Sequence, residues 1–190
     1  VLDHLSIVVS SGLSEGLASA LNNERVLIDS IMTRLRSLVE ETGLGLILVS
    51  HLKRPEGKSH EEGAATSLAQ LRGSGGIGHL ADMVIGAERN QQSADDVHKT
   101  RLRVLKNRYA GETGLACTLE YNTDTSKSNY IQNNFTDIIL GKDSSFKNYT
   151  VQGNKSKGFF YNKLFERHLL KHCLEEIFHK VVMFYVILKY

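Results

Sequence analysis

The sequence predicts an α/β fold in which a mainly parallel sheet is followed by a C-terminal antiparallel hairpin. Residues 46–49 are all apolar, which is typical of a strand buried on both faces of a parallel sheet. A helix-like pattern precedes this run, and another predicted strand precedes the helix. Strand, helix and strand in this order favour a right-handed crossover, which makes the strands parallel and brings their ends to one edge of the sheet.

Length and composition indicate one ordinary domain, or a domain with an appendage, in 190 residues. The apolar fraction of 41% and the charged fraction of 23% are those of a soluble globular protein. A net charge of +2 is too small to indicate a nucleic-acid partner by itself. Cys117 and Cys173 show no pairing pattern, which favours a reducing compartment and hence the cytoplasm.

Neither end of the chain indicates a membrane partner. No signal peptide is visible, and the longest apolar segment, residues 181–188, is shorter than the ~20 residues of a membrane-spanning helix. The chain has no initiator methionine and opens inside an apolar run. We therefore expect it to be a piece of a longer protein.

Residues 1–9 are predicted to begin as a buried strand whose first residues are missing, with Asp3 near the end of that strand. A carboxylate at that position can hold Mg²⁺ through its water shell in nucleotide-binding sheets, although a turn residue that ends the strand is the plainer interpretation. Residues 10–23 are predicted to be a loop. A helix follows, with Asn22 or Asn23 as its N-cap and Gly43 as its stop. Its apolar stripe consists of Ile28, Ile31, Met32, Leu35, Leu38 and Val39.

The strand at residues 46–49 ends abruptly at Ser50 and His51. Ligands of open α/β sheets lie just beyond the carboxyl ends of the strands, so His51 is a candidate site residue and is expected to lie near Asp3. The basic residues Lys53, Arg54 and Lys58 follow, mixed with three glutamates. This segment either grips backbone phosphates of a nucleic acid or is an ordinary solvated loop.

The second half of the predicted domain contains a glycine-rich stretch and the hairpin. Residues 67–82 include four glycines within six residues but lack the Gly-Lys-Ser/Thr ending of a phosphate-binding P-loop. Residues 83–87 are a predicted buried strand, and residues 100–106 and 115–121 are predicted to pair around a turn with Gly111 and Gly114. Arg108 near the hairpin tip is suited to stabilise phosphate charge, or it is a plain surface arginine.

Six blocks of this sequence occur in an order and at separations that resemble a known family. They are LDHLSIVV at 2–9, SHLK at 50–53, HEEG at 60–63, LRGSG at 71–75, ERNQQ at 88–92 and LKNRYAGETG at 105–114. Together they resemble the C-terminal helicase domain of tailed-phage primase–helicases, which are ring-shaped replicative helicases of the DnaB-like class with a RecA-like core. The resemblance covers residues 1–125, and six ordered blocks are far more specific than any one of them.

The resemblance implies a role for each matching residue. Asp3 matches the Walker B aspartate that serves Mg²⁺, and His51 matches the strand-tip histidine that senses the terminal phosphate of ATP or dTTP. Lys106 and Arg108 match a basic pair that reaches the nucleotide of the neighbouring subunit, with Arg108 as arginine finger. The central DNA-binding loop of the family corresponds to Lys53, Arg54 and Lys58.

The same resemblance implies binding partners, and the sequence departs from the family pattern at one position. An ATP-dependent DNA helicase of this kind moves on single-stranded DNA as a ring, with a hexamer as the expected form, and can contact other replication proteins. His79 stands where the family often has a glutamine between the nucleotide and the DNA loops.

Three functional interpretations remain open at this point. The P-loop and the glutamate that activates water would precede Val1, so the 190 residues alone are expected not to hydrolyse ATP. The first interpretation is a fragment of the helicase motor, and the second is a non-catalytic remnant that binds DNA or associates with a ring. The third, a recombinase with the same core, is disfavoured by the blocks at 72–75 and 89–92.

The last part of the chain, residues 126–190, has a different composition. All seven phenylalanines lie at or after Phe135, and thirteen of the sixteen glycines precede Gly141. A boundary is therefore expected near residues 124–134, with a tail of unknown role that read-through, an altered frame or a fusion would explain. Residues 135–140 could form a short strand, and 163 to about 184 a helix. His168 and His172 would share a face of that helix but lack a third metal ligand.

Overall fold

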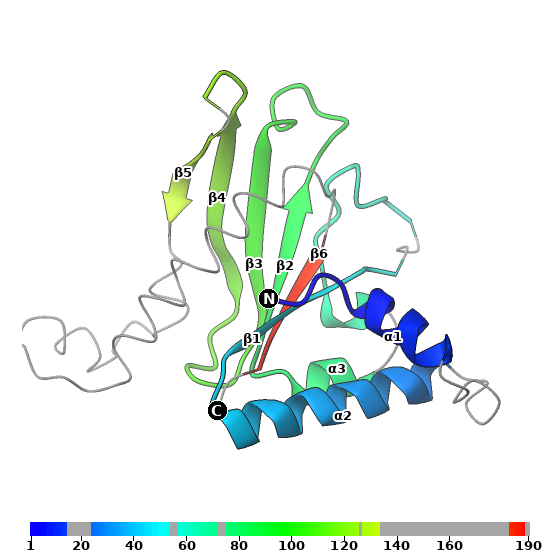
Figure 1. The fold of residues 1–190 in the computed structure, drawn as a ribbon. Helices are drawn as coiled ribbons and strands as arrows, with labels where there is room; N and C mark the ends of the chain where they lie inside the picture. The colour runs from blue at the N-terminus through cyan, green and yellow to red at the C-terminus, as the bar shows by residue number, and fades with distance from the viewer. Residues whose placement is uncertain (15–23, 54–56, 72–74, 126, 134–182, 189–190) are drawn as a thin grey trace, which may run out of the picture.

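The computed structural model describes residues 1–14, 24–53, 57–71, 75–125, 127–133 and 183–188, which form one mixed α/β unit. Three helices lie on one side of a six-stranded sheet, next to β1 (Figure 1). In chain order the elements are α1 (Leu5–Ser14), α2 (Glu24–Thr42), β1 (Leu46–Ser50), a short 3₁₀ helix (Leu68–Gln70), α3 (Gly75–Leu80), β2 (Met83–Arg89), β3 (Lys99–Asn107), β4 (Gly114–Asn122), β5 (Lys127–Asn133) and β6 (Met183–Leu188).

The sheet has the strand order β1-β6-β2-β3-β4-β5. All pairings between the named strands of the described part are antiparallel, so the prediction of a mainly parallel sheet is not confirmed. The reason is the position of β6, which comes from the end of the chain and lies between β1 and β2. Because β6 is antiparallel to both, β1 and β2 still run in the same direction.

The start of the chain differs from its prediction. Only Leu2 pairs in strand fashion, through a parallel bridge to Leu48, and α1 begins at Leu5. The buried strand predicted at the start of residues 1–9 is therefore reduced to the bridge at Leu2. The loop prediction for residues 10–14 was wrong, because these residues belong to α1. A short apolar run fits either a buried strand or a helix, and here Leu5 and Val9, four residues apart, face the core together.

Helix α2 confirms the helix that the sequence predicts. The apolar stripe buries Ile28, Met32 and Val39, and Gly43 follows the helix with φ = +67°. The Gly43 N–H donates to the Val39 carbonyl at 2.9 Å, which is the glycine stop expected at this position. Leu38 is the exception in the stripe, because its side chain is exposed.

Strands β2, β3 and β4 also agree with the sequence pattern. Strand β2 is buried from Met83 to Glu88, and β3 alternates, with Leu102 and Val104 buried and Arg101 and Arg103 partly exposed. The hairpin of β3 and β4 has the expected antiparallel pairing. Gly111 and Gly114 in its turn have positive φ angles, which only glycine adopts at little cost.

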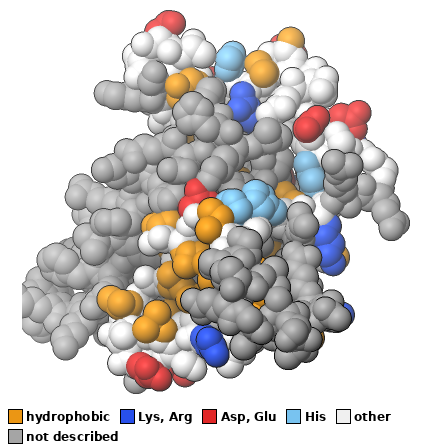
Figure 2. Space-filling model, turned by 45° about the vertical axis from the view of Figure 1, so that its right-hand side comes forward, with side chains coloured by type: hydrophobic (Ala, Val, Ile, Leu, Met, Phe, Trp, Pro, Cys, Tyr) orange, Lys and Arg blue, Asp and Glu red, His pale blue; other side chains and the backbone are white. Residues whose placement is uncertain are grey.

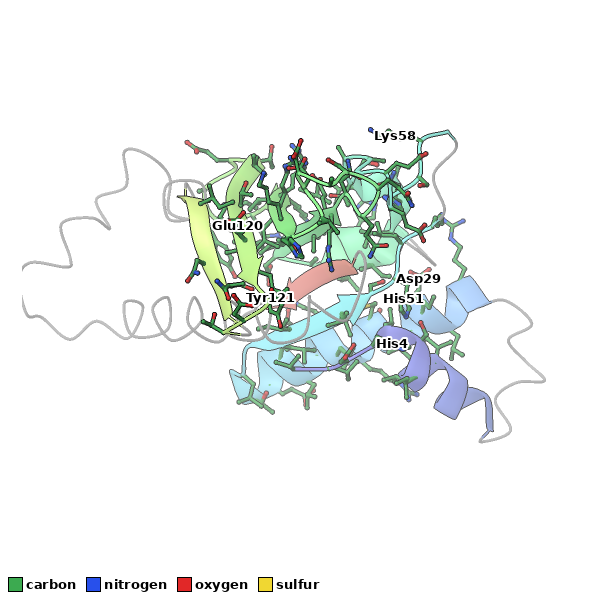
Figure 3. The ribbon with its side chains drawn as sticks, turned by 90° about the horizontal axis from the view of Figure 1, so that it is seen from above. His4, Asp29, His51, Lys58, Glu120 and Tyr121 are labelled. Carbon is green, nitrogen blue, oxygen red and sulfur yellow. The ribbon has the colours of Figure 1, made fainter. Side chains whose placement is uncertain are left out.

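The main hydrophobic core lies between the helices and the β1 side of the sheet. It joins α1, α2 and α3 to the first part of β2 through side chains that are almost fully buried: Leu5, Val9, Leu27, Ile28, Met32, Val39, Leu48, Ile77 and Val84. Figure 3 shows α1 and α2 along one side of the sheet. This packing fixes the end of β1, where the candidate site begins.

The residues after 126 contribute two strands to the same sheet. Strand β5 extends the sheet beyond β4, and β6 joins β1 to β2. The helix expected to reach about residue 184 is wrong at its last residues, because Met183 and Phe184 begin β6. The rest of that helix, His168, His172, Cys173 and the strand expected at 135–140 lie outside the described residues. No helix among those described is long and apolar enough to span a membrane.

Candidate functional site

The first part of the candidate site is the end of β1. The Leu2 N–H donates to the Ile47 carbonyl at 2.8 Å, and the Val49 N–H donates to the Leu2 carbonyl at 3.0 Å. This parallel bridge places Leu2 beside Leu48 of β1. The next residues, Asp3 and His4, therefore continue toward the same end of the sheet as Ser50 and His51. The sequence expectation that Asp3 and His51 belong to one edge agrees with this geometry.

His4 contacts His51 directly, and sequence reasoning missed it. The two imidazole rings meet edge to face, with centroids 4.4 Å apart and an angle of 63° between the planes. Figure 3 labels both rings close together, with Asp29 of α2 nearby. Figure 2 shows histidine side chains gathered at the surface beside an acidic side chain. The position of His4 directly after Asp3 was the signal in the sequence that could have pointed to it.

A metal at this edge would have few protein ligands. Within the described ranges, no three His, Cys, Asp or Glu side chains are grouped so that they could hold a metal ion. Asp3 itself is exposed. Mg²⁺ keeps most of its waters and often binds through one carboxylate together with phosphate oxygens, so a single exposed carboxylate fits Mg²⁺ but not a cation held by protein ligands alone.

The second part of the site is the basic segment that follows His51. Lys53 and Lys58 are exposed, and Arg54 lies outside the described residues. The Lys53 N–H donates to the Gln70 carbonyl at 2.8 Å, and His60 Nε2 lies 3.2 Å from the Lys53 carbonyl oxygen. The segment is therefore tied down directly at its first residue. Figure 3 shows Lys58 on the side of the molecule away from α2.

The far end of the same segment is anchored to β2 and β3. The Gln91 N–H donates to the Glu61 carbonyl at 2.8 Å. The Thr66 N–H and hydroxyl both donate to Glu88 Oε1, at 2.8 and 2.9 Å. Glu88, which is 5% exposed, is neutralised by Arg103 Nε at 2.7 Å, so the buried carboxylate has a charged partner. The segment is thus bound at its first residue to the 3₁₀ helix and at its far end to β2.

The third part of the site is Lys106 and Arg108 at the end of β3. Lys106 Nζ donates to the carbonyls of Gly78 and His79 in α3, at 2.7 and 3.2 Å. Burial, and next the charge of Arg108, lower the pKa of Lys106, while the charge of Asp82 acts in the opposite direction. Arg108 Nη2 also donates to the His79 carbonyl, at 3.1 Å. The end of α3 therefore holds both cations that the sequence singled out.

Arg108 has a stronger partner that sequence reasoning missed. Arg108 Nη1 donates to Asp82 Oδ1 at 2.8 Å, and Arg36 Nη1 of α2 donates to Asp82 Oδ2 at 2.7 Å. The Asp82 side chain is 3% exposed, whereas Arg108 is 48% exposed. The signal in the sequence was an aspartate between a glycine-rich stretch and a predicted buried strand.

His51 and Arg108 are not brought together within one chain. The strand registers place Met83 of β2 and Asn107 of β3 level with Ile47, near the start of β1. Ser50 at the other end of β1 is level with Gly86. Arg108 therefore lies at the end of the sheet where β1 begins, and His51 lies at the opposite end, where β1 stops.

Comparison with known proteins places these features in a family. Residues 1–129 match the model of the DnaB-like helicase C-terminal domain. The chain belongs to this family. The DNA helicase/primase of Enterobacteria phage T3 is 48% identical over 126 residues, which cover 66% of this DnaB-like chain and 21% of the phage T3 protein. The chain thus spans about a fifth of the length of this relative, and the match supports its assignment as a fragment of a phage primase–helicase.

Proposed function

We propose that this DnaB-like chain is part of the motor of an ATP-driven replicative DNA helicase, built on a RecA-like core. The observation that supports this function best is the direct connection between His51, at the end of β1, and the exposed lysines of the anchored segment, Lys53 and Lys58. A change at the nucleotide that displaces His51 moves Lys53, two residues further on. The chain would in this way couple hydrolysis to movement on single-stranded DNA.

The nucleotide site that we propose at this edge uses Asp3 and His51. Asp3 would hold Mg²⁺, and His51 would sense the terminal phosphate of ATP or dTTP. Mg²⁺, when bound, neutralises charge on the phosphate oxygens during transfer. The exposed Asp3 carboxylate suits this role, because Mg²⁺ needs only one or two protein carboxylates beside phosphate and water.

Arg108 and Lys106 would serve the nucleotide of a neighbouring copy. Their position at the opposite end of the sheet from His51 supports this proposal, since one chain cannot aim both groups at a single terminal phosphate. A site shared between copies calls for a closed, head-to-tail assembly, and we propose a ring, with a hexamer as its expected form. In comparable enzymes, an arginine supplied by a neighbour raises the rate ~10³–10⁵-fold.

A second function applies to the 190 residues acting alone. They contain no complete Gly-x-x-x-x-Gly-Lys-Ser/Thr motif. Gly57, Lys58 and Ser59 match the end of this motif, but Leu52 occupies the position of its first glycine. We therefore propose that the chain by itself binds DNA or associates with a ring without hydrolysing ATP.

Binding of single-stranded DNA by the purified chain tests the role of the basic segment. We expect Lys53→Ala/Lys58→Ala to weaken binding to a fluorescent oligothymidylate. Each lost phosphate contact should reduce the slope of log K against log salt by about 0.7, and hence by about 1.4 for both. The measurement is fluorescence anisotropy at several salt concentrations.

The matched control removes two exposed arginines of α2, in Arg25→Ala/Arg34→Ala. This variant has the same change in charge, but α2 lies on the other side of the molecule from Lys58 (Figure 3). Its salt slope should stay close to that of the unchanged chain. Equal slopes for both double variants would exclude a specific DNA role for the segment.

A further inference from the structure

Asp82 occupies an unusual position between two arginines from distant parts of the chain. Its two carboxylate oxygens accept from Arg108 Nη1 at 2.8 Å and from Arg36 Nη1 at 2.7 Å. Its carbonyl oxygen also accepts from the Arg108 N–H at 2.9 Å. Asp82 therefore holds both the backbone and the guanidinium of Arg108. A charge-assisted bond to a buried carboxylate is among the stronger hydrogen bonds in proteins.

Arg36 fixes Asp82 from the opposite side. It belongs to α2, and its Nε also donates to Glu40 one turn further along the helix, at 2.7 Å. The pKa of Arg36 is raised, first by the bond to Glu40 and then by the bond and charge of Asp82, although burial acts against this. Because α2 packs into the core through Met32 and Val39, Asp82 is connected to a helix that is anchored in the core.

This arrangement holds Arg108 on one side and leaves the other side accessible. Two of its five guanidinium N–H donors bind Asp82 and the His79 carbonyl, while about half of the side chain is exposed. Donors that are already oriented stabilise developing charge better than donors that must reorganise. Without a partner, a long arginine side chain samples many rotamers and loses that advantage.

We propose that Asp82 is the positioning residue of Arg108, and that Arg36 fixes Asp82 in turn. The inference rests on the function proposed above for Arg108, because positioning matters for activity only if Arg108 acts on a nucleotide. Asp82 itself lies beneath the guanidinium, so it acts through Arg108 and not on a substrate.

The first test uses the 190-residue chain and the ¹⁵N–¹H signals of the arginine Nε groups. We expect the Arg108 side chain to be ordered in the unchanged chain and to become mobile in Asp82→Asn, as a lower heteronuclear NOE. Asp82→Glu, which keeps the carboxylate, should restore part of the order. Thermal melting of each variant verifies that it folds. An Arg108 signal that is equally ordered in Asp82→Asn overturns the proposal.

The matched control is Asp96→Asn. Asp96 also pairs with two cations, Lys99 at 3.2 Å and Arg101 at 2.8 Å, and it lies outside the proposed site. This variant removes the same charge from the chain but should leave the Arg108 signal unchanged. A loss of Arg108 order in this control as well would show a general effect of charge, and would overturn the assignment to Asp82.

The second test measures hydrolysis in a chimera, in which the aligned 126 residues of this chain replace the matching segment of the phage T3 DNA helicase/primase. We expect Asp82→Asn to lower kcat about 10- to 100-fold with little change in KM, because oriented charge acts in the transition state. In an Arg108→Ala background, Asp82→Asn should have no further effect.

The possible outcomes separate this inference from the proposed function. If Arg108→Ala leaves kcat unchanged, the finger role proposed for Arg108 is wrong, whatever the spectra show. If Arg108→Ala lowers kcat but Asp82→Asn does not, Arg108 acts without Asp82 and the inference is wrong. If the double variant lowers kcat by the product of the two single reductions, the inference is also wrong, because Asp82 would then act independently of Arg108.

Discussion

Cys117 shows how burial in the sheet controls the chemistry of a single residue. It lies in β4, its side chain is fully buried, and burial raises the pKa of its thiol from 9.0 to about 12. In a Cys173→Ser variant, in which Cys117 is the single thiol, we expect almost no reaction with a thiol reagent at pH 8 until urea unfolds the chain. The measurement is the rate of modification with and without urea, and fast modification of the folded chain would contradict it.

The same pKa shift gives stability a defined pH dependence. The folded chain favours the neutral thiol, so this contribution to stability is complete below about pH 9 and is lost as pH rises toward about 12. Replacing Cys117 by alanine should remove this part of the alkaline decline, at the cost of a small cavity in the core.

Single residues differ in how far the sequence reveals them. His51 was predicted because it follows an apolar strand directly, a pattern that is local. Asp82 and Arg36 are 46 positions apart, and the helical pattern of α2 placed Arg36 outside the apolar stripe without naming its partner. Periodicity indicates which way a side chain points, but an ion pair between elements depends on packing that no local pattern contains.

Strand β2 depends on a glycine for its contact with the end of the basic segment. An alanine Cβ at Gly86 would overlap the Thr66 hydroxyl and lie 2.8 Å from the Thr66 Cβ. The close approach lets Thr66 donate to Glu88. We therefore expect Gly86→Ala to lower the free energy of unfolding by about 1–3 kcal/mol, measured by urea denaturation.

Two further variants make the Gly86 experiment specific. Gly45→Ala is the control, because no atom lies within 4 Å of a Cβ placed there, and it should change stability little. Thr66→Gly in the Gly86→Ala background should recover part of the loss by making room, although the bonds of the hydroxyl to Glu88 stay absent. Equal effects of Gly86→Ala and Gly45→Ala would contradict the proposed contact.

Elements with a long, clear pattern were predictable, and short ones were not. Helix α2 is 19 residues long, with a regular apolar stripe and a glycine stop, and β3 alternates between partly exposed and buried residues from Lys99 to Val104. The run at residues 1–9 is too short to distinguish a strand from a helix by its pattern. Which structure each residue adopts depends on whether a neighbouring strand offers it backbone partners. Leu2 pairs with Leu48 of β1, whereas the residues from Leu5 onward form the helix α1.

At the scale of the whole molecule, the sheet is joined by a strand from the last residues described. Among the named strands, β1 pairs with β6, and β6 pairs with β2. The local sequence predicted β1 and β2 as strands because each is apolar, but it assigned the first residues of β6 to a helix, and no local pattern indicates which strands become neighbours. For this reason the mixed α/β class was predictable, whereas the strand order was not.

The central position of β6 predicts that its backbone hydrogen bonds hold the β1 side to the rest of the sheet. Val186 pairs with Leu48 on one side and with Val84 on the other, so Val186→Pro removes a backbone donor from the middle of the sheet. We expect this variant to lower the melting temperature by about 10 °C or more, because each kcal/mol corresponds to about 2–4 °C in a domain of this size.

Two comparisons isolate the role of β6 in this experiment. Ile131→Pro places the same residue in the edge strand β5, which pairs with β4, and edge strands tolerate proline better; its melting temperature should fall much less. A chain that ends at residue 182 should also melt early, and excess peptide with the sequence of residues 183–190 should raise its melting temperature with peptide concentration. A peptide of scrambled order should not. If the shortened chain melted like the complete one, β6 would not join the two parts of the sheet, and the core between β1 and the helices would hold its side of the molecule alone.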